Sequence, residues 1–465
     1  MEATDARKEA FRILRRVDRE GAYSSLLLQN LGEHRALEPR DLALTTELVY
    51  GVLRRRLRLD DLIGNHSSRP VAEIDPDLLL ILRLALYQVL YLDRIPAHAA
   101  VNTAVELARA RMKGKGERAA SFVNGLLRAV IRARPAGAGA EEPGGDPVAS
   151  LAIAESHPEW LVRRWVARMG FEETAALLAA HNRPAPLALR VNRARVEPGD
   201  LAARLAGQQV ATRASRFLDD FLVVEEGRPQ HSPSFQGGEF YIQDEASGLV
   251  ARMAAAGPGM RVLDACAAPG GKALAVASSV GGSGDVMADT GFVVAADLHP
   301  ARLRLLEDNA RRLGIEACLA IAADFAACPP PFLPSTRFDL VMVDAPCTGT
   351  GVIRRNPELR YRVDSDAIDS LSRVQERLLA QCAPLVRPGG ALTYSVCSIE
   401  PEEGVEQARR FLRGNPGFEL SDPRDVLPAA ARGLVAETDA GACLVTWPHR
   451  DDLDGFFAAR FVRRG

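Results

Sequence analysis

The sequence lacks the features that mark secreted, membrane-bound or metal-stapled proteins. It has no Cys-x-x-Cys pair and no histidine at zinc-ligand spacing, so we expect no structural metal. The charged start, MEATDARKEAFRILRR, has no apolar stretch of the kind a signal peptide needs. The longest apolar stretch, Leu78–Leu92, is interrupted by Arg83 and Gln88 and is too short to cross a bilayer. We therefore expect a cytoplasmic protein, a monomer, with no membrane partner.

The thiols are scattered, and an odd number of them suits a reducing compartment. The cysteines are Cys266, Cys318, Cys328, Cys347, Cys382, Cys397 and Cys443. Lysine is scarce as well. Only four of the 58 basic residues are Lys: Lys8, Lys113, Lys115 and Lys272. Each position that has Lys instead of Arg therefore calls for an explanation.

Charge is unevenly distributed. Residues 1–140 contain 23 Lys and Arg against 17 Asp and Glu, whereas the whole chain has a net charge of −2. A basic module on an acidic body is typical of a protein with a polyanionic partner. A solvated helical surface explains the same charge equally well.

A length of 465 residues predicts two or three domains. In residues 1–134 apolar residues recur every three or four positions, which predicts an all-α domain. Residues 135–150 begin with PAGAGAEEPGGDP, which has no such periodicity and is typical of a linker. Residues 151–245 combine the amphipathic helix HPEWLVRRWVARMG with the strand patterns LALRVNRARV and FLVVEE, which predicts a small α+β subdomain.

Strands and helices alternate from Gly257 onward, so residues 246–465 are predicted to be an α/β, Rossmann-like domain. Alternation predicts a parallel sheet covered on both faces. The predicted strands are MRVLDA, FVVAADL, CLAIAAD, FDLVMVDAP, GGALTYSVC, GACLVTW and FFAARFV. The predicted helices between them include Arg302–Leu313 and Ile368–Ala383.

Polar or reactive residues end the first five strands of this predicted sheet. They are Asp264, Asp297, Asp324, Asp344 and Cys397. The carboxyl ends of parallel strands share the edge where ligands bind in such folds. A single Asp there is commonplace, because Asp caps helices and starts turns. Four Asp residues at corresponding strand ends, together with a thiol, favour a functional edge of the sheet over coincidence.

The first strand runs into DACAAPGGK, whose small residues let the backbone approach a ligand at a helix N-terminus. The segment is neither a Gly-x-Gly-x-x-Gly fingerprint nor a P-loop. Asp297 fits either a ribose diol or the cap of the helix beginning near Pro300, and these two roles are compatible.

Two cysteines are predicted to reach the same edge. Cys347 lies in DAPCTGTG after the fourth strand, and Cys397 lies in YSVCSIEPEE after the fifth. A free cysteine is more often an inert buried thiol than a nucleophile. Their shared position beside Asp344 favours chemistry over packing.

These motifs resemble the Sun family of RNA cytosine-C5 methyltransferases, and within it the RsmB-type bacterial enzymes that act on 16S ribosomal RNA. Weaker similarity extends to HPEWL, LRVN, QDEAS and FVNGLLR, and LVYGVLR resembles the NusB-like RNA-binding domain of that branch. The resemblance covers essentially the whole chain. It implies S-adenosylmethionine as cofactor, ribosomal RNA as partner, and a class I methyltransferase fold for residues 246–465.

The resemblance also implies roles for single residues. Those that would hold the methionine and ribose of the cofactor are Cys266, Ala267, Ala268, Pro269, Gly270, Gly271 and Lys272. Asp297 would bind the ribose hydroxyls, and Asp324 would lie by the adenine. Asp344 would touch cofactor and target base. Cys397 would be the nucleophile, and Cys347 would help release the product.

Three segments depart from the family pattern. Val396 stands where Thr usually precedes the nucleophile, and Gly404 stands where Asn is usual. Gly281–Gly291 is longer than the usual link into the second strand. None of the departures removes a residue with an implied chemical role, but a hydroxyl is missing beside the active thiol.

The implied reaction is covalent catalysis. A thiolate that adds to C6 of cytosine makes C5 nucleophilic enough to take a methyl group. A free cysteine has a pKa of about 8.5, and a charged Asp344 nearby would disfavour the thiolate, a tension that the sequence leaves open. The target base must also be unstacked, so a loop or a flipped base is expected.

Three other functions remain open at this point. A DNA cytosine methyltransferase would take its nucleophile from Pro346–Cys347 instead. A transfer RNA or another RNA is an alternative substrate. A catalytically silent RNA-binding assembly factor would share the fold but would have no need of two thiols at the edge.

Overall fold

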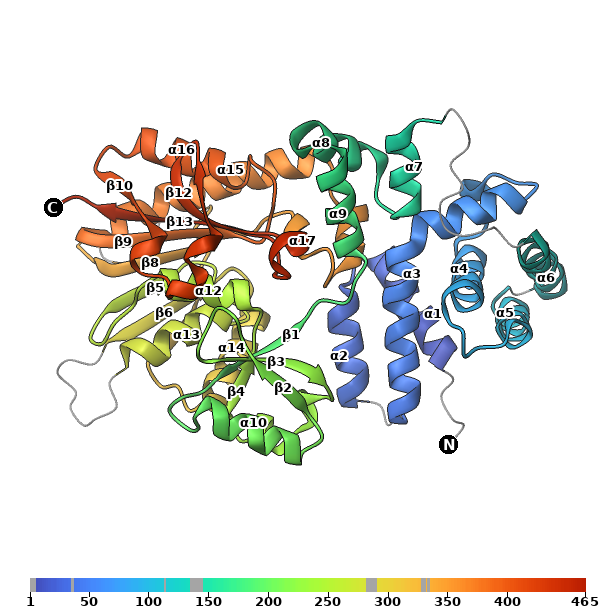
Figure 1. The fold of residues 1–465 in the computed structure, drawn as a ribbon, viewed down its shortest axis with the longest axis horizontal. Coiled ribbons are helices and arrows are strands. Elements are labelled where there is room, and N and C mark those ends of the chain that lie inside the picture. The colour runs from blue at the N-terminus through green and yellow to red at the C-terminus, as the bar shows by residue number, and fades with distance from the viewer. Residues whose placement is uncertain are drawn as a thin grey trace. The chain divides into compact units, whose positions relative to one another are not determined.

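The computed structural model describes residues 6–34, 37–112, 114–133, 145–281, 291–327, 332 and 335–465 (Figure 1). These residues form two compact units. The first combines the chain up to Pro184 with the later segment Ile353–Arg362, and the second combines Ala185–Val352 with Val363–Gly465. Residues 135–144 of the predicted linker 135–150, and residues 282–290 of the predicted insertion Gly281–Gly291, lie outside the described residues.

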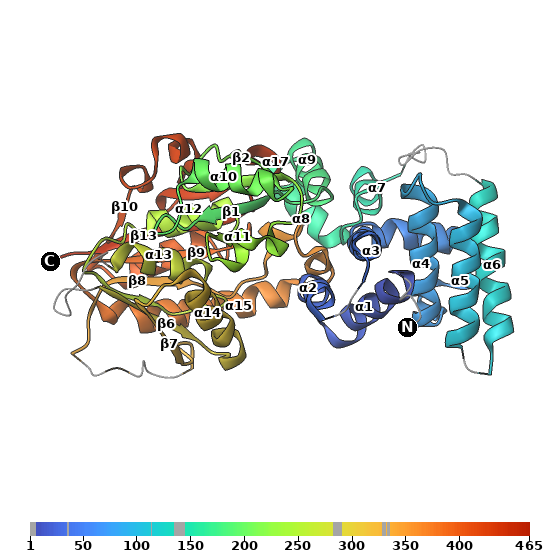
Figure 2. The ribbon, with the colours of Figure 1, turned by 90° about the horizontal axis from the view of Figure 1, so that it is seen from below.

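Helices make up the first unit, as the periodicity predicts for its N-terminal part. They are α1 (Ala6–Glu20), α2 (Ser24–His34), α3 (Pro39–His66), α4 (Pro76–Tyr91), α5 (Ala97–Arg111), α6 (Gly116–Ala133), α7 (Pro147–Ala154), α8 (Glu159–Met169) and α9 (Phe171–His181). Figure 2 shows α4, α5 and α6 side by side. Leu82 of α4 and Leu127 of α6 are buried in the same apolar cluster. Asp75 caps α4 by accepting from the amides of Asp77 and Leu78, and Pro76 takes the first helical position. No helix of the described residues is long and apolar enough to cross a membrane.

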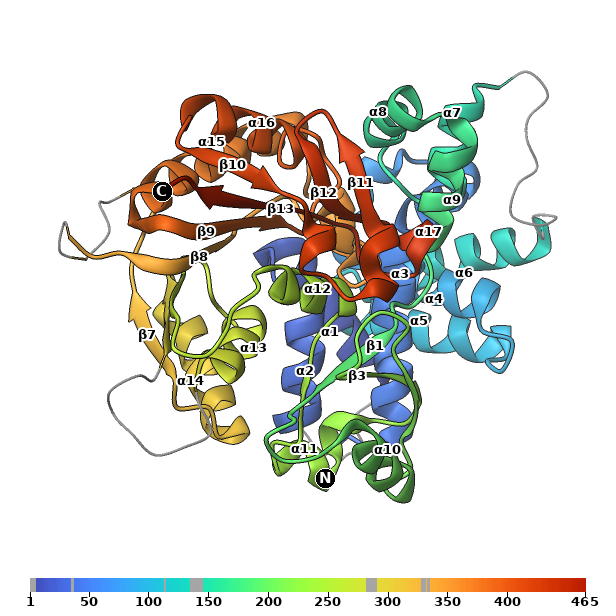
Figure 3. The ribbon, with the colours of Figure 1, turned by 60° about the vertical axis from the view of Figure 1, so that its left-hand side comes forward.

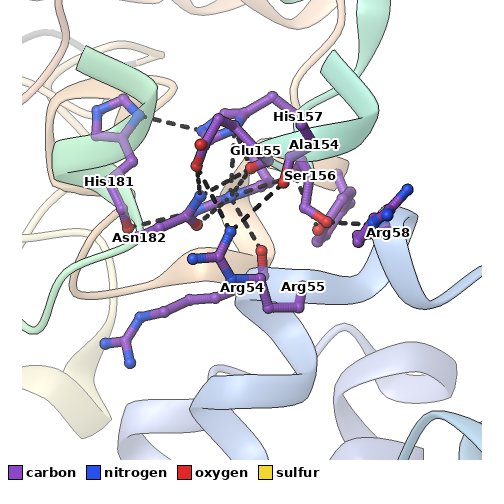
Figure 4. A network of polar contacts seen from close by, with 11 residues as sticks. Arg54, Arg55, Arg58, Ala154, Glu155, Ser156, His157, His181 and Asn182 are labelled. Carbon is purple, nitrogen blue, oxygen red and sulfur yellow. Dashed lines mark hydrogen bonds and ion pairs between the residues drawn. The ribbon is translucent and has the colours of Figure 1, made fainter. Parts of the chain in front are cut away.

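A polar network joins the helices of the first unit to its late segment (Figure 4). Arg360, which is fully buried on the short helix η4 (Pro357–Tyr361), donates to Asn182 Oδ1 at 2.9 Å, to the Ser156 carbonyl at 3.2 Å and to the His181 carbonyl at 3.3 Å. Glu358 accepts from the amide and hydroxyl of Ser24 at 2.8 and 2.9 Å. Residues 353–362, which directly follow DAPCTGTG, are therefore an integral part of the helical unit.

Part of the basic charge of residues 1–140 is used inside this network. Arg54 donates to the Arg354 carbonyl at 3.4 Å, and Arg55 donates to the Ala154 carbonyl at 3.4 Å. Arg58 pairs with Asp61 at 3.0 Å. The densest run of arginine on α3 thus holds protein groups, which weakens the inference of a polyanionic partner from charge alone.

A small sheet opens the second unit, and it agrees with the predicted α+β subdomain (Figure 3). Its strands are β1 (Leu187–Val191), β2 (Ala211–Ala214), β3 (Phe221–Glu226) and β4 (Phe240–Ile242), in the antiparallel order β2-β3-β1-β4. The helices α10 (Pro198–Gly207) and α11 (Pro233–Gln236) accompany it. The short strands β2 and β4 were not predicted, because three or four residues carry too little alternation to be recognised.

The large sheet has the strand order β11-β12-β13-β9-β8-β5-β6-β7, with β10 paired to β13. Its strands are β5 (Arg261–Asp264), β6 (Phe292–Asp297), β7 (Cys318–Ala322), β8 (Phe338–Asp344), β9 (Val386–Val396), β10 (Phe418–Ser421), β11 (Val435–Thr438), β12 (Gly441–Thr446) and β13 (Phe456–Arg463). The strands β5 to β9 are parallel, as predicted. The expectation of a parallel sheet is wrong for the two later predicted strands, β12 and β13, which pair antiparallel with their neighbours. The antiparallel strands β10 and β11 were not predicted. The turn between β11 and β12 is too short for the crossover that a parallel pair requires.

Helices cover both faces of the large sheet, as predicted. They are α12 (Glu245–Met253), α13 (Gly271–Val280), α14 (Pro300–Leu313), α15 (Ser365–Cys382), α16 (Val405–Gly414) and α17 (Pro448–Asp451). Leu263 and Val341 pack with α15 and α16, whereas their neighbours Val262 and Leu340 pack with α13 and α14. This alternation fixes which strand ends face the same edge.

Candidate active site

Two parallel strands deliver the two cysteines to one place. Asp344 at the end of β8 is in register with Ser395 of β9, and each strand continues directly into a cysteine loop. The sulfur of Cys347 lies 3.4 Å from the sulfur of Cys397. The sequence predicts a shared edge for these residues, and the structure brings the two thiols into contact there.

Lysine and serine hold the carboxylate of Asp344 from two sides. The ammonium of Lys272, the second residue of α13, lies 2.7 Å from Asp344 Oδ2, and the Ser395 hydroxyl donates to Oδ1 at 2.7 Å. Burial by itself lowers the pKa of Lys272, but the charge and hydrogen bond of Asp344 outweigh it and raise that pKa. Lys272 therefore stays cationic and offsets the negative charge that Asp344 brings to the thiols.

The loop of Cys347 is fixed by Glu403, a residue for which the sequence suggested no role. Its buried carboxylate accepts from the amide of Thr348 at 2.9 Å, from the Thr348 hydroxyl and from Gln375 at 3.1 Å. Gly351 packs so closely on Gly455 that an added Cβ would lie 2.0 Å from the Gly455 carbonyl oxygen. The signal in the sequence for this role of Glu403 is its place in the motif YSVCSIEPEE, which also contains Cys397.

The cofactor loop between β5 and α13 depends on a glycine. Gly270 has a φ of +109°, and an added Cβ would meet Leu306 at 2.9 Å. Asp264 at the end of β5 is fully buried, and its Oδ2 has no hydrogen-bond partner among the described residues. Burial, with Asp344 as the next contributor, raises the pKa of Asp264 to about 7. The loop thus combines tight backbone packing with an unsatisfied acidic group.

The remaining two acids have local backbone partners. Asp297 Oδ1 accepts from the amide of His299 at 2.9 Å, and Oδ2 accepts from the amide of Ala268 at 3.2 Å. Asp324 Oδ1 accepts from Ala326 and Ala327 at 2.8 and 3.0 Å. Asp297 therefore joins the end of β6 to the cofactor loop, whereas Asp324 shapes the turn after β7. A carboxylate oxygen keeps lone pairs for a further donor in both cases.

Comparison with known proteins agrees with the arrangement of these parts. The model of 16S rRNA methyltransferase RsmB/F matches residues 253–462, that of the NusB family matches residues 4–132, and a ferredoxin-like domain of the RsmF/B type matches residues 157–231. A probable ribosomal RNA small subunit methyltransferase B of Bacillus subtilis is 36% identical over 467 residues, covering 100% of both chains. The chain belongs to the RsmB/F methyltransferase family.

Other members of the RsmB/F family are similar along most of the chain. The ribosomal RNA small subunit methyltransferase B of Pseudomonas putida is 34% identical over 92% of each chain. Among solved structures, the crystal structure of PH0851 has a TM-score of 0.80 at 26% identity and covers 97% of this chain and 98% of that chain. NSun6 from Pyrococcus horikoshii has a TM-score of 0.57 at 19% identity and covers 66% of this chain, which supports the fold alone.

Two of the three departures from the family pattern, Val396 and Gly404, lie among the described residues. Val396 is fully buried at the end of β9, inside the apolar cluster beneath the thiols. Gly404 precedes α16, and a Cβ there would lie 3.1 Å from the ring of Phe457. A larger residue at position 404 would therefore require Phe457 to move. The third departure lies outside the described residues, except for its ends, Gly281 and Gly291.

Proposed function

We propose that the protein transfers a methyl group from S-adenosylmethionine to C5 of a cytosine in 16S ribosomal RNA. The observation that supports this most directly is the contact of two thiols, 3.4 Å apart, beside the Lys272–Asp344 ion pair. The small-subunit ribosomal RNA target is supported by the names of relatives that cover 100% and 92% of the chain.

The residues of the loop fit the proposed cofactor. S-adenosylmethionine, when bound, supplies an electrophilic methyl group on a positively charged sulfur. Cys266–Lys272 would hold its methionine and ribose, Asp297 its ribose hydroxyls, and Asp324 its adenine. The unsatisfied Oδ2 of Asp264 and the tight turn at Gly270 support a ligand against this loop.

Cys397 is the proposed nucleophile. Its sulfur adds to C6 of the cytosine, which pushes electron density toward C5. The Lys272 ammonium lies within electrostatic reach of Cys397. Asp344, paired with Lys272, can accept a hydrogen bond from the cytosine amino group, which orients the base.

Cys347 is the proposed base that removes the C5 proton. The hydrogen bond that the Cys347 thiol donates to Cys397 is the largest cause that raises its pKa, followed by burial and the charge of Cys397. Bonding of Cys397 to C6 removes the first and third of these causes. The pKa of Cys347 therefore falls when the covalent adduct forms, so that Cys347 becomes easier to ionise at the step that needs a base. The Cys347 thiolate takes the proton from C5, and the electrons of that C–H bond form the C5=C6 double bond as the C6–S bond breaks. Cys397 leaves as a thiolate and C5 stays methylated.

Mass analysis of 16S ribosomal RNA from a deletion strain tests this function. We expect one 5-methylcytosine to be missing and to return with the wild-type gene but not with Cys397→Ala. Loss of a methyl group from transfer RNA alone would identify another RNA substrate. Unchanged RNA would favour a silent assembly factor, and return with Cys397→Ala would move the nucleophile to Cys347.

A further inference from the structure

A second polar cavity lies in the second unit, apart from the thiols. Its volume is about 450 Å³, which is within the range of small-ligand sites. The side chains that matter here are Arg190 of β1, Tyr241 of β4, Asp220, Arg252 of α12 and Ser279 of α13. The described lining residues of the cavity do not include Cys347 or Cys397, or any residue of the loop Cys266–Lys272.

Arg190 brings an unpaired charge to this cavity. It is 8% exposed, and its guanidinium lies over the ring of Tyr241 at 5.5 Å. Among the described residues it forms no side-chain hydrogen bond and no ion pair, and the groups whose charge acts favourably on it are Tyr241 and Asp220. Burying such a charge is unfavourable unless a partner is present. Burial lowers the pKa of Arg190 only to about 10, so the group is charged at neutral pH.

The neighbouring charges are already paired with one another. Arg193 lies 2.9 Å from Asp219, and Arg252 lies 2.8 Å from Asp220. Arg193, Arg252 and Ser279 are exposed, which opens the cavity to solvent, whereas Arg190 is buried. Arg190 is therefore a buried guanidinium of this lining that has no ion pair among the described residues, although the charge of Asp220 acts on it.

The Tyr241 hydroxyl adds a second donor. Burial raises the pKa of this phenol, so it keeps its proton. Its ring contacts the position where a Cβ on Gly271 would lie, at 3.5 Å, which connects this wall to the start of α13. A buried guanidinium beside a phenol offers a fork of N–H donors and one O–H donor, which suits the tetrahedral oxygens of phosphate.

We propose that this cavity binds a phosphate group through Arg190 and Tyr241, and that a bound RNA strand supplies it. The RNA source rests on the proposed function, whereas the phosphate site does not. A backbone phosphate held here would position the RNA without reading its sequence.

Calorimetric titration of the full-length protein with inorganic phosphate tests the site. We expect Arg190→Met to weaken phosphate binding at least about tenfold and Tyr241→Phe to weaken it less, because only one donor is lost. Arg261→Met is the matched control, since Arg261 lies near Asp339 and does not line the cavity. Equal phosphate affinity in the wild type and Arg190→Met would overturn the proposal. Water alone would then solvate Arg190.

Binding of deproteinised 16S ribosomal RNA across a series of KCl concentrations tests the source. Loss of one phosphate contact should lower the slope of log affinity against log salt by about one in Arg190→Met, with Arg261→Met unchanged. An unchanged slope together with lost phosphate binding would overturn the RNA source and assign the site to a free phosphate ligand. A failure of the wild type to methylate RNA would refute the proposed function without affecting the phosphate titration.

Discussion

Two buried arginines of this protein look alike by burial and differ in their partners. Desolvation lowers the pKa of both Arg190 and Arg360 to about 10. Arg360 donates to the carbonyl oxygens of His181 and Ser156 and to the side-chain oxygen of Asn182, whereas Arg190 faces a cavity, lies over the Tyr241 ring and makes no hydrogen bond among the described residues. The comparison teaches that burial of a charge does not by itself mark a ligand site. The hydrogen-bonded Arg360 holds a segment in place, although its Nε has no partner among the described residues, whereas the Arg190 guanidinium is available to a ligand.

The proposed active site extends this comparison. The Glu403 carboxylate is buried and satisfied by the loop of Cys347, so it resembles Arg360. Asp264 Oδ2 and the two thiols resemble Arg190, because the protein leaves them able to bond to a ligand. Substitution of a satisfied group should cost stability, whereas substitution of an unsatisfied one should cost function. The predictions below test that rule, beginning with the largest effect.

The two cysteines should separate most sharply. Cys397→Ala should show neither methylation nor covalent RNA, because it cannot form the adduct. Cys347→Ala should methylate and then stall as a protein–RNA conjugate that survives denaturing electrophoresis and requires S-adenosylmethionine. Both variants should unfold at nearly the wild-type temperature. Reversed behaviour would make Cys347 the nucleophile, and full activity in both would reduce the thiols to packing residues.

Lys272→Arg should fold normally and lose most methylation. The ammonium is buried 2.7 Å from Asp344 and 5.0 Å from the centre of the Phe456 ring, and a planar guanidinium has a different shape and reach. Lys115→Arg is a matched control at an exposed position. Initial rates with saturating cofactor measure the effect, and full activity of Lys272→Arg would refute the need for a compact ammonium.

Arg360→Met should lower the free energy of unfolding by about 3 kcal/mol, because it leaves buried carbonyl oxygens without donors. Arg190→Met should stay within about 1 kcal/mol of the wild type, because no hydrogen bond is lost. Urea unfolding followed by circular dichroism compares the two. Similar losses of unfolding free energy in both variants would refute the distinction between Arg360 and Arg190 on which the phosphate site depends.

Asp264→Asn should change how stability depends on pH. The folded pKa of about 7 lies above the ordinary value for Asp, so between roughly pH 4 and pH 7 the folded state holds more protons than the unfolded state. Stability from this group therefore falls as pH rises through that window. The asparagine variant should lack this decline and be more stable than the wild type at pH 8. Parallel thermal-unfolding curves from pH 5 to pH 8 would refute the raised pKa.

The sequence predicted the catalytic strands well and the end of the sheet less well. Each of the strands β5 to β9 is a compact apolar run followed by a polar residue, and that pattern has a direct physical cause in a sheet buried on both faces. The C-terminal strands carry similar runs, so composition did not reveal that they pair antiparallel. Likewise, the place of Ile353–Arg362 in the helical unit has no local signal, because its partners lie about 170 to 330 residues earlier in the chain.

By itself the sequence determined which chemical groups are present and the strand ends on which they lie, because strand periodicity and turn residues act locally. It predicted a shared edge for Cys347, Cys397, Asp344 and the loop Cys266–Lys272 for this reason. Only the tertiary structure decided the partners: Lys272 with Asp344, Glu403 with the loop of Cys347, and Arg190 with an open cavity. The satisfaction of a buried charge depends on groups that folding brings together from distant parts of the chain, and residue type alone does not specify them.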